Sequence, residues 1–337
     1  MVGSLMAVGC AVESEEETAG VAEDDLARKS NEHWFYNGPL DALGSPEVTI
    51  SLTGHTARVR GFTSVNVSSL PHAKARNVGG RQQVDLVYPI ATGESNGYNA
   101  RPREYSLYRA TLFRPDGQTT SSFGTSYVTW GGFPFLAYHG GIAMHGPISY
   151  EDSRDNPDFD VWYLKRGKVS HGCNRMLGEH VTEVAHVLGM SMRKVYDGDR
   201  SYTPPAGIKV RVINEYDRVD GKYVDVDYPT ANGAQRPGVV HGASNVAMFG
   251  SWVATEMPNG ADLPGDKAWE GGVSGDPYVF AEHARLNWVC SMPRNTLLKL
   301  RSWEQSRSGR ELPRNLCAKK ACVISAVNNN RSPETCF

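Results

Sequence analysis

The sequence has no long apolar stretch, because no run of 18 or more apolar residues occurs in its 337 residues. A helix needs such a run to cross a bilayer, so we expect no membrane-spanning helix. An excess of positive charge is also lacking, since 35 Lys and Arg residues oppose 37 Asp and Glu residues. This balance excludes a general nucleic-acid-binding surface and broad adhesion to anionic membranes.

The usual zinc-binding patterns are missing as well. The sequence contains no His-Glu-x-x-His segment, no His-x-His pair and no Cys-x2-Cys knuckle. These patterns place metal ligands on one face of a helix or within one tight turn. We therefore expect no zinc peptidase and no metal site.

Basic residues are absent before Arg28, and the first ten residues are small and apolar and end at Cys10. The segment Ala7-Val8-Gly9-Cys10 looks like the cleavage box of a bacterial lipoprotein signal. A complete signal has a cationic start and a longer apolar core, so it would begin upstream of Met1. We expect residues 1–10 to be a signal remnant with a lipid on Cys10; the alternative is a disordered terminus with a free thiol.

The next segment carries charge of one sign only. Residues 13–25 include seven acidic residues and no basic one. Such a run buries too little apolar surface to fold. Residues 11–30 are therefore predicted to form an acidic, disordered tether.

Four of the six cysteines lie in the last 48 residues, namely Cys290, Cys317, Cys322 and Cys336. An even, clustered set favours two disulfides, which persist in an oxidising compartment. Four cysteines allow three pairings, and the sequence does not choose among them. A zinc site is the competing interpretation, with only a Cys-x4-Cys spacing to support it.

High glycine and proline contents, 35 and 19 residues, favour turns and short strands over a helical bundle. Strands are predicted where β-branched and apolar residues alternate or form short runs. One helix is predicted over 177–190, where apolar residues recur at helical spacing. The predicted strands cover 47–53, 84–90, 105–113, 126–130, 142–146, 207–213, 223–228, 288–290 and 297–303.

One short segment, Val169 to Met176, carries residues suited to nucleophilic chemistry. Cys173 becomes a strong nucleophile only as a thiolate, which needs a nearby base or positive charge. His171 lies two residues earlier, and Gly172 allows a tight turn that brings amide N–H groups together. Converging amides suit the oxyanion of an acyl transfer. The alternative is an inert buried cysteine beside a core histidine.

The segment Ser170-His171-Gly172-Cys173-x-Arg175, preceded by the strand Ile142-Ala-Met-His145-Gly146, resembles the catalytic motif of the L,D-transpeptidase (YkuD) family. Tyr88 to Glu94 is similar to the strand and Thr-Gly segment of that family. The resemblance covers about residues 47–215. Two departures leave substrate preference open: the spacer 146–169 is longer than usual, and Asn174 replaces an apolar residue.

The resemblance implies a mainly β fold. Residues 31–215 would form the L,D-transpeptidase catalytic β-sandwich with one or few helices. Residues 216–337 would form a disulfide-stapled C-terminal extension, whose role is open.

The resemblance also assigns roles to residues of the site. Cys173 would be the nucleophile, and His145 its general base, with the Gly146 carbonyl fixing the imidazole tautomer. Ser170 and His171 would shape the site, and amides around Gly172 and Cys173 would form the oxyanion hole. Arg175 and Asn174 would contact substrate, Arg175 by binding a carboxylate. His139 is the alternative base.

The implied reaction is a two-step acyl transfer. Cys173 would attack a peptidoglycan tetrapeptide stem, release D-Ala, and pass the acyl group to an amine. That amine would belong to another stem, giving a 3–3 cross-link, or to an outer-membrane protein. No cofactor is implied. We expect a periplasmic or cell-envelope protein that is lipid-anchored through Cys10. The alternatives are a hydrolase on the same scaffold, in which water accepts the acyl group, and a non-catalytic cell-wall-binding lipoprotein.

Overall fold

The computed structural model describes residues 35–36, 38–94, 97–111, 134–146, 164–170, 172–190, 203–224, 246–249, 255–256, 289–306 and 315–337. Strands dominate this part of the chain, alongside α2 (Gly178–Val187), α5 (Arg294–Gln305) and α6 (Lys320–Asn328). The prediction of a mainly β fold with few helices is confirmed. Within the same residues, no helix has the length and hydrophobicity needed to span a bilayer. Cys10, the tether 11–30, the strand over 126–130 and most of the spacer 146–169 lie outside the described residues.

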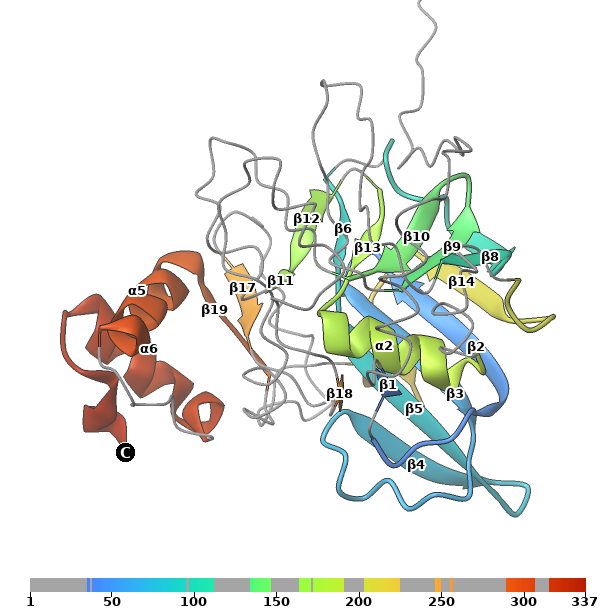
Figure 1. Cartoon of the computed structure of the whole chain (residues 1–337), viewed down its shortest axis with the longest axis horizontal. Helices are drawn as coiled ribbons and strands as arrows, with labels where there is room; N and C mark the ends of the chain where they lie inside the picture. Colours follow the sequence, from blue (N-terminus) through green and yellow to red (C-terminus); the bar gives the residue numbers. More distant parts are fainter. Residues whose placement is uncertain are drawn as a thin grey trace, which may run out of the picture.

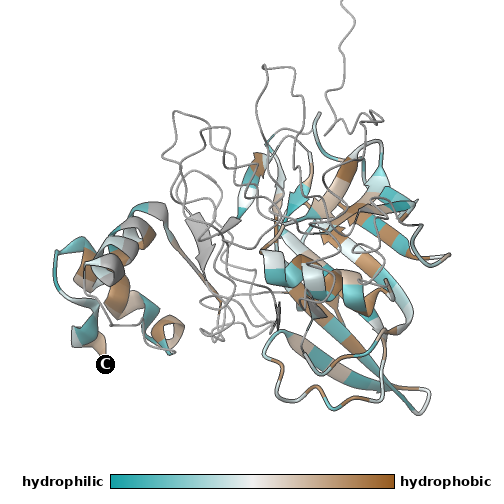
Figure 2. Ribbon diagram, viewed as in Figure 1, coloured by the Kyte–Doolittle hydropathy of each residue, from teal (hydrophilic) through white to brown (hydrophobic). Residues whose placement is uncertain are grey.

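The largest sheet has six strands in the order β4-β5-β3-β2-β14-β7 (Figure 1). Its strands are β2 (Gly44–Ser51), β3 (Thr56–Phe62), β4 (Ala73–Val78), β5 (Arg81–Pro89), β7 (Arg103–Ser106) and β14 (Lys209–Ile213). All neighbours are antiparallel except β2 and β14, which run parallel. Figure 2 shows hydrophobic and hydrophilic residues alternating along these strands. One face of the sheet therefore lies on the main core, as period-two alternation requires.

The second sheet has the order β13-β10-β9-β8 and carries the residues of the motif. Its strands are β8 (Arg109–Thr111), β9 (Phe135–His139), β10 (Ile142–His145) and β13 (Asn174–Arg175). Leu136, Tyr138 and Met144 belong to the main core, and we call their side of the sheet the core face. Alternate residues point to the opposite side, the site face.

Helix α2 forms where the 3.6-residue spacing predicts it, and it covers the main core. Val181, Val184 and Ala185 are fully buried in that core. The helix ends at Val187, two residues before Gly189, which has a φ of +83° and donates its N–H to the carbonyl of His186. Glycine adopts this left-handed conformation at low cost, so it is a common helix terminator.

Glu183 ties α2 to the six-stranded sheet through a buried polar cluster. One oxygen of Glu183, Oε1, lies 2.5 Å from Nε2 of His72 and accepts a 2.6 Å hydrogen bond from the Tyr88 hydroxyl. Burial by itself raises the pKa of Glu183. The charge of His72 and the hydrogen bonds from His72, Tyr88 and Tyr36 outweigh burial and lower that pKa. The carboxylate is therefore held in its charged form inside the core.

The C-terminal region forms a small helical unit with its own hydrophobic cluster, which includes Leu297, Leu300 and Val323. The unit contains α5, α6 and two short 3-10 helices, η5 (Leu316–Lys319) and η6 (Pro333–Cys336). Two disulfides, Cys290–Cys317 and Cys322–Cys336, hold it together. The predicted pair of disulfides is confirmed, and the structure supplies the pairing.

A three-stranded sheet connects this unit to the strands of the motif. Strand β19 (Cys290–Pro293) pairs with β17 (Val246–Phe249), which pairs with β11 (Leu164–Lys165). In Figure 1 the helices α5 and α6 lie at the outer end of this sheet. Strand β11 is followed after one residue by β12 (Gly167–Ser170), so the sheet reaches the segment that leads to Cys173. Two other strand pairs are β1 (Phe35–Tyr36) with β18 (Thr255–Glu256), and β15 (Arg218–Val219) with β16 (Lys222–Tyr223).

The strand predicted over 297–303 is wrong, because these residues form most of α5. Leu297 and Leu300 are both fully buried three residues apart, which is helical spacing. The run also lacks the β-branched residues that favour strands. The strand predicted over 105–113 is interrupted: β7 ends at Ser106 and β8 begins at Arg109.

Candidate active site

The chain reaches Cys173 along β12, which runs parallel to β6 (Ala91–Gly93). Ser170 ends β12, and its hydroxyl donates to the Cys173 carbonyl at 2.5 Å and accepts the Gly172 N–H at 3.0 Å. The Ser170 carbonyl in turn accepts the N–H of Glu94 at 2.8 Å. Ser170 therefore holds the turn that presents Cys173.

Gly172 makes a close approach that a side chain would prevent. Its φ is +130°, and a Cβ atom there would lie 2.5 Å from the carbonyl oxygen of Tyr98. That oxygen belongs to the backbone and cannot swing away as a side-chain tip can. The N–H of Gly172 donates to Ser170 Oγ at 3.0 Å. The oxyanion hole expected from the amides around Gly172 and Cys173 stays a prediction.

Strand pairing brings the histidine strand to the cysteine segment. Strands β10 and β13 run parallel, with His145 in register with Arg175 and Met144 with Asn174. The carbonyl of His145 accepts the N–H of Met176 at 2.8 Å. The two halves of the motif, separated in sequence by residues 146–169, are therefore neighbours in one sheet.

His145 has a fixed tautomer and is held neutral. Its Nδ1 lies 2.7 Å from the Gly146 carbonyl oxygen, which can only accept, so Nδ1 carries the proton and Nε2 is the basic nitrogen. Burial, and then the positive charge of Arg175, lower the pKa of His145 to about 3, against the opposing effect of the Gly146 hydrogen bond. The ring stacks on Phe135 at a centroid distance of 5.7 Å. The His145–Gly146 contact implied by the resemblance is present; the catalytic role stays a prediction.

Cys173 is 1% exposed, and its Sγ lies 3.6 Å from the carbonyl oxygen of Gly141. The sulfur is disulfide-bonded in this structure, and no free cysteine occurs among the described residues. A disulfide sulfur is no nucleophile, so the role expected of Cys173 requires its reduced form and stays a prediction.

Asn174 and Arg175 lie on opposite sides of their strand. Asn174 has no exposed surface, and its Oδ1 accepts a 2.7 Å hydrogen bond from the hydroxyl of Tyr138, on the core face. This placement assigns Asn174 to the core and away from substrate contact. Arg175 is partly exposed and shares the site face with His145. The expected role of Arg175 in substrate contact therefore remains geometrically open.

The remaining predicted residues are placed as follows. His139, the alternative base, lies at the end of β9 against the ring of Tyr105, with centroids 4.7 Å apart. Partial burial and the charge of Arg103 lower the pKa of His139. His171 lies outside the described residues.

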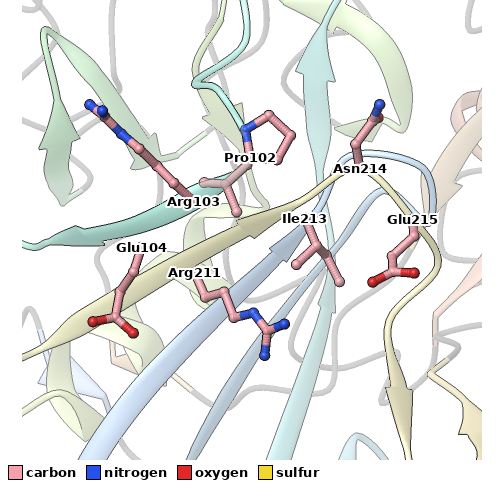
Figure 3. Close-up of a pocket in the computed structure, with 8 residues that line it drawn as sticks. Pro102, Arg103, Glu104, Arg211, Ile213, Asn214 and Glu215 are labelled. Atoms are coloured by element: carbon pink, nitrogen blue, oxygen red, sulfur yellow. The ribbon is translucent and has the colours of Figure 1, made fainter.

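The structure also has a hollow that sequence reasoning missed, at the outer edge of the six-stranded sheet (Figure 3). It lies over β7 and the end of β14, and Glu104 and Arg211, on neighbouring strands, line it. The hollow contains none of the motif residues, which sit on the second sheet. Among the described residues, no three His, Cys, Asp or Glu side chains gather closely enough to hold a metal ion.

Comparisons with known proteins give limited likenesses. The sequence matches no protein-family profile and no curated protein. Among solved structures, it is similar to an L,D-transpeptidase (Yku) from Stackebrandtia nassauensis, at 17% identity, over 58% of this chain and 68% of that chain, with a TM-score of 0.26. It is also similar to Bd1075 of Bdellovibrio bacteriovorus, at 10% identity, over 55% of this chain and 53% of that chain, with a TM-score of 0.27. The solved structures similar to this chain thus include an L,D-transpeptidase.

Proposed function

We propose that this protein is a cysteine acyltransferase of the L,D-transpeptidase type, active when Cys173 is reduced. The observation that carries the proposal is the pairing of β10 with β13. This pairing places His145 beside Arg175, two residues after Cys173. The Gly146 carbonyl binds Nδ1 of His145, so Nε2 is the basic nitrogen. A nucleophile, a base and a group that orients the base form the arrangement that activates a thiol.

The reaction begins when Nε2 of His145 accepts the proton of the reduced Cys173 thiol. The thiolate attacks the carbonyl of the third residue of a peptidoglycan stem, and the amide bond to D-Ala breaks. His145 returns its proton to the leaving amine, so free D-Ala departs and a thioester remains. An acceptor amine then attacks the thioester and gives a proton to His145. The C–S bond breaks, and His145 passes that proton to the Cys173 thiolate, which restores the thiol.

Burial of the pair supports acyl transfer to an amine. Cys173 and His145 are almost completely shielded from water, at 1% and 0% exposure. Excluding water protects a thioester from hydrolysis and strengthens the electrostatic effect of the Arg175 charge.

The cellular setting belongs to the same proposal. Two disulfides in the C-terminal unit are typical of an oxidising compartment, which supports a periplasmic or cell-envelope location. Anchoring through Cys10 stays a prediction. So do the partners, which are peptidoglycan stems as donors, with a second stem or an outer-membrane protein as acceptor.

Mass spectrometry of a disaccharide-tetrapeptide incubated with the full chain tests the proposal, with and without a phosphine reductant. We expect reductant-dependent loss of D-Ala and a new cross-linked dimer, both abolished in Cys173→Ala. His145→Gln should lose at least about 10²-fold in rate, the usual contribution of a positioned base.

A matched control separates reduction at Cys173 from reduction elsewhere. The double variant Cys322→Ser with Cys336→Ser lacks the exposed C-terminal disulfide and should keep its activity. Loss of D-Ala without a dimer would indicate the hydrolase. Equal turnover by Cys173→Ala and the wild-type protein would exclude the mechanism.

A further inference from the structure

Residues 167–177, the cysteine segment, carry the proposed nucleophile, and both ends of this segment contact parts of the chain that come much later in the sequence. At the first end, β11 lies one residue before β12 and pairs with β17, which pairs with β19. In Figure 1 these three strands lie between α5 and β12. Because a single residue joins β11 to β12, a shift of β11 would be passed on to the strand that leads to Cys173.

At the other end, Leu177 occupies the N-cap position of α2. A leucine side chain has no polar atom that could cap the helix, so packing must fix the start of α2. Leu177 is fully buried and belongs to a small hydrophobic cluster with Val87 of β5, Val224 and Val289. This cluster, which we call the Leu177 cluster, therefore sets the position of the chain four residues after Cys173.

Val289 connects the C-terminal unit to the Leu177 cluster. It is fully buried, and it directly precedes Cys290, the first residue of β19. Cys290 belongs to the hydrophobic cluster of the C-terminal unit and forms a disulfide with Cys317. Two consecutive residues thus lie in two different clusters, because neighbouring side chains of an extended chain point to opposite sides. The C-terminal unit therefore reaches one end of the cysteine segment through Val289 and the other end through β19, β17 and β11.

We propose that Val289 is a positioning residue for Cys173, and that the C-terminal unit contributes to the reaction by holding the cysteine segment at both ends. The inference rests on the proposed function and gives a role to the C-terminal extension. Val289 has no exposed surface, so it touches no substrate and acts through Leu177 and β19. Such packing matters because a nucleophile must stay within about 0.5 Å of its productive position.

Val289→Ala in the full chain tests the inference, because it removes two methyl groups from the Leu177 cluster and leaves space into which Leu177 can move. With reductant present, we expect kcat for D-Ala release to fall about tenfold or more, since a misplacement of about 1 Å can cost on the order of 10²-fold. KM should stay unchanged, because Val289 makes no substrate contact. Val289→Ile keeps the β-branched shape and should retain most of the wild-type kcat.

Val323→Ala is the matched control. Val323 is also fully buried, but it lies in α6 within the cluster of the C-terminal unit. The same change there loosens the unit and leaves the Leu177 cluster intact, so kcat should equal that of the wild-type protein at a temperature where both variants are folded. Equal losses of kcat in the two variants, a wild-type kcat for Val289→Ala, or a change in KM alone would overturn the inference.

Hydrogen exchange gives a second measurement that needs no turnover. Peptides that cover residues 172–177 should exchange faster in Val289→Ala than in the wild-type protein, and at the wild-type rate in Val323→Ala. If the wild-type protein releases no D-Ala, the proposed function fails, and the exchange rates alone decide whether Val289 holds the cysteine segment. Unchanged exchange at 172–177 in Val289→Ala would overturn the inference in either case.

Discussion

Gly172 fixes the backbone at the residue before the proposed nucleophile. Gly172→Ala places a methyl group 2.5 Å from the Tyr98 carbonyl oxygen, at a φ of +130° that L-residues rarely adopt. We expect loss of stability by more than about 1 kcal/mol from backbone strain alone, and loss of D-Ala release from displacement of Cys173.

The control for this change is Gly221→Ala. Gly221 also has a positive φ, +76°, but no atom lies within 4 Å of the point that a Cβ would occupy there. It should show the backbone cost without the collision, and full activity. Thermal unfolding and the turnover assay measure both effects; identical behaviour of the two variants would mean that the Tyr98 contact is unimportant.

His145 should make folding sensitive to mild acid. Its folded pKa is about 3, whereas an unfolded histidine titrates near 6.5. Below pH 6.5 His145 binds a proton in the unfolded chain, whereas in the folded chain it binds one only near pH 3. The free energy of unfolding therefore falls as the pH is lowered from about 6.5 to about 3. From pH 7 to pH 5 this residue should cost about 2 kcal/mol, at 1.36 kcal/mol per pKa unit.

Urea unfolding at pH 7 and pH 5 checks this prediction. His145→Gln should lose about that much less stability on acidification than the wild-type protein. His139→Gln, at a partly exposed histidine on the same sheet, should keep most of the wild-type pH dependence. Parallel slopes for wild type and His145→Gln would contradict a buried neutral imidazole.

At this scale the sequence located the motif but not its surroundings. The resemblance pointed to Cys173, His145 and Gly146, and strand pairing brings their two segments together, while their catalytic roles stay predictions. The sequence alone did not show on which side of the sheet the Asn174 side chain lies, because that side depends on the strand to which the residue belongs.

The attachment of α2 to the sheet depends on one carboxylate. Glu183→Ala leaves Nε2 of His72 buried without its hydrogen-bond partner and removes the acceptor of the Tyr88 hydroxyl. Each buried polar group left unpaired costs roughly 1–3 kcal/mol, so we expect a loss of unfolding free energy of about that size for each of the two groups.

Glu104→Ala provides the matched control, because Glu104 pairs with Lys209 at 3.0 Å on the surface. An exposed pair contributes little, so this variant should unfold as the wild-type protein does. Chemical denaturation followed by circular dichroism measures both. A Glu183→Ala protein as stable as Glu104→Ala would show that apolar contacts alone hold α2.

Elements followed from local patterns where burial had a clear period. The strand over 207–213 shows this, because its residues alternate between exposed and buried. The helix over 177–190 and the strands over 47–53 and 84–90 are buried on most sides, so the types and spacing of their residues, and not a burial period, predicted them. The run 297–303 was wrongly predicted as a strand. Its leucines indicate a helix only once it is known that Leu297 and Leu300 are buried in the same cluster as the disulfide cysteines. Strand order was not predictable, since β14 pairs with β2 far away in the sequence.

At the scale of the molecule, the C-terminal unit should depend on its cross-links more than the catalytic sheets do. The Cys322–Cys336 disulfide joins residues 14 apart in the sequence. Closing a loop of about 15 residues stabilises by roughly 3 kcal/mol through the entropy of the unfolded chain. The double serine variant should therefore exchange amide hydrogens faster in α6.

Hydrogen exchange read by mass spectrometry separates the two regions. Peptides from β2 and β3 should exchange at the wild-type rate, because their contacts lie within the six-stranded sheet. Faster exchange in β2 and β3 as well would mean that the C-terminal unit stabilises the whole fold, through the sheet of β11, β17 and β19.

The parallel pairing of β2 with β14 has a consequence for biosynthesis. Strand β2 gains β14 as its second neighbour only after Lys209, the partner of Glu47, has been synthesised. The two disulfides, in contrast, join cysteines only 27 and 14 positions apart in the sequence. Distant pairings form slowly because a long loop must close first. A nascent chain emerging from its N-terminus would thus hold an incomplete sheet with an open edge until β14, which ends at Ile213, has been made. We expect chaperones to bind that open edge. The C-terminal unit, which is synthesised after it, should be the quickest part to form its cross-links by oxidation.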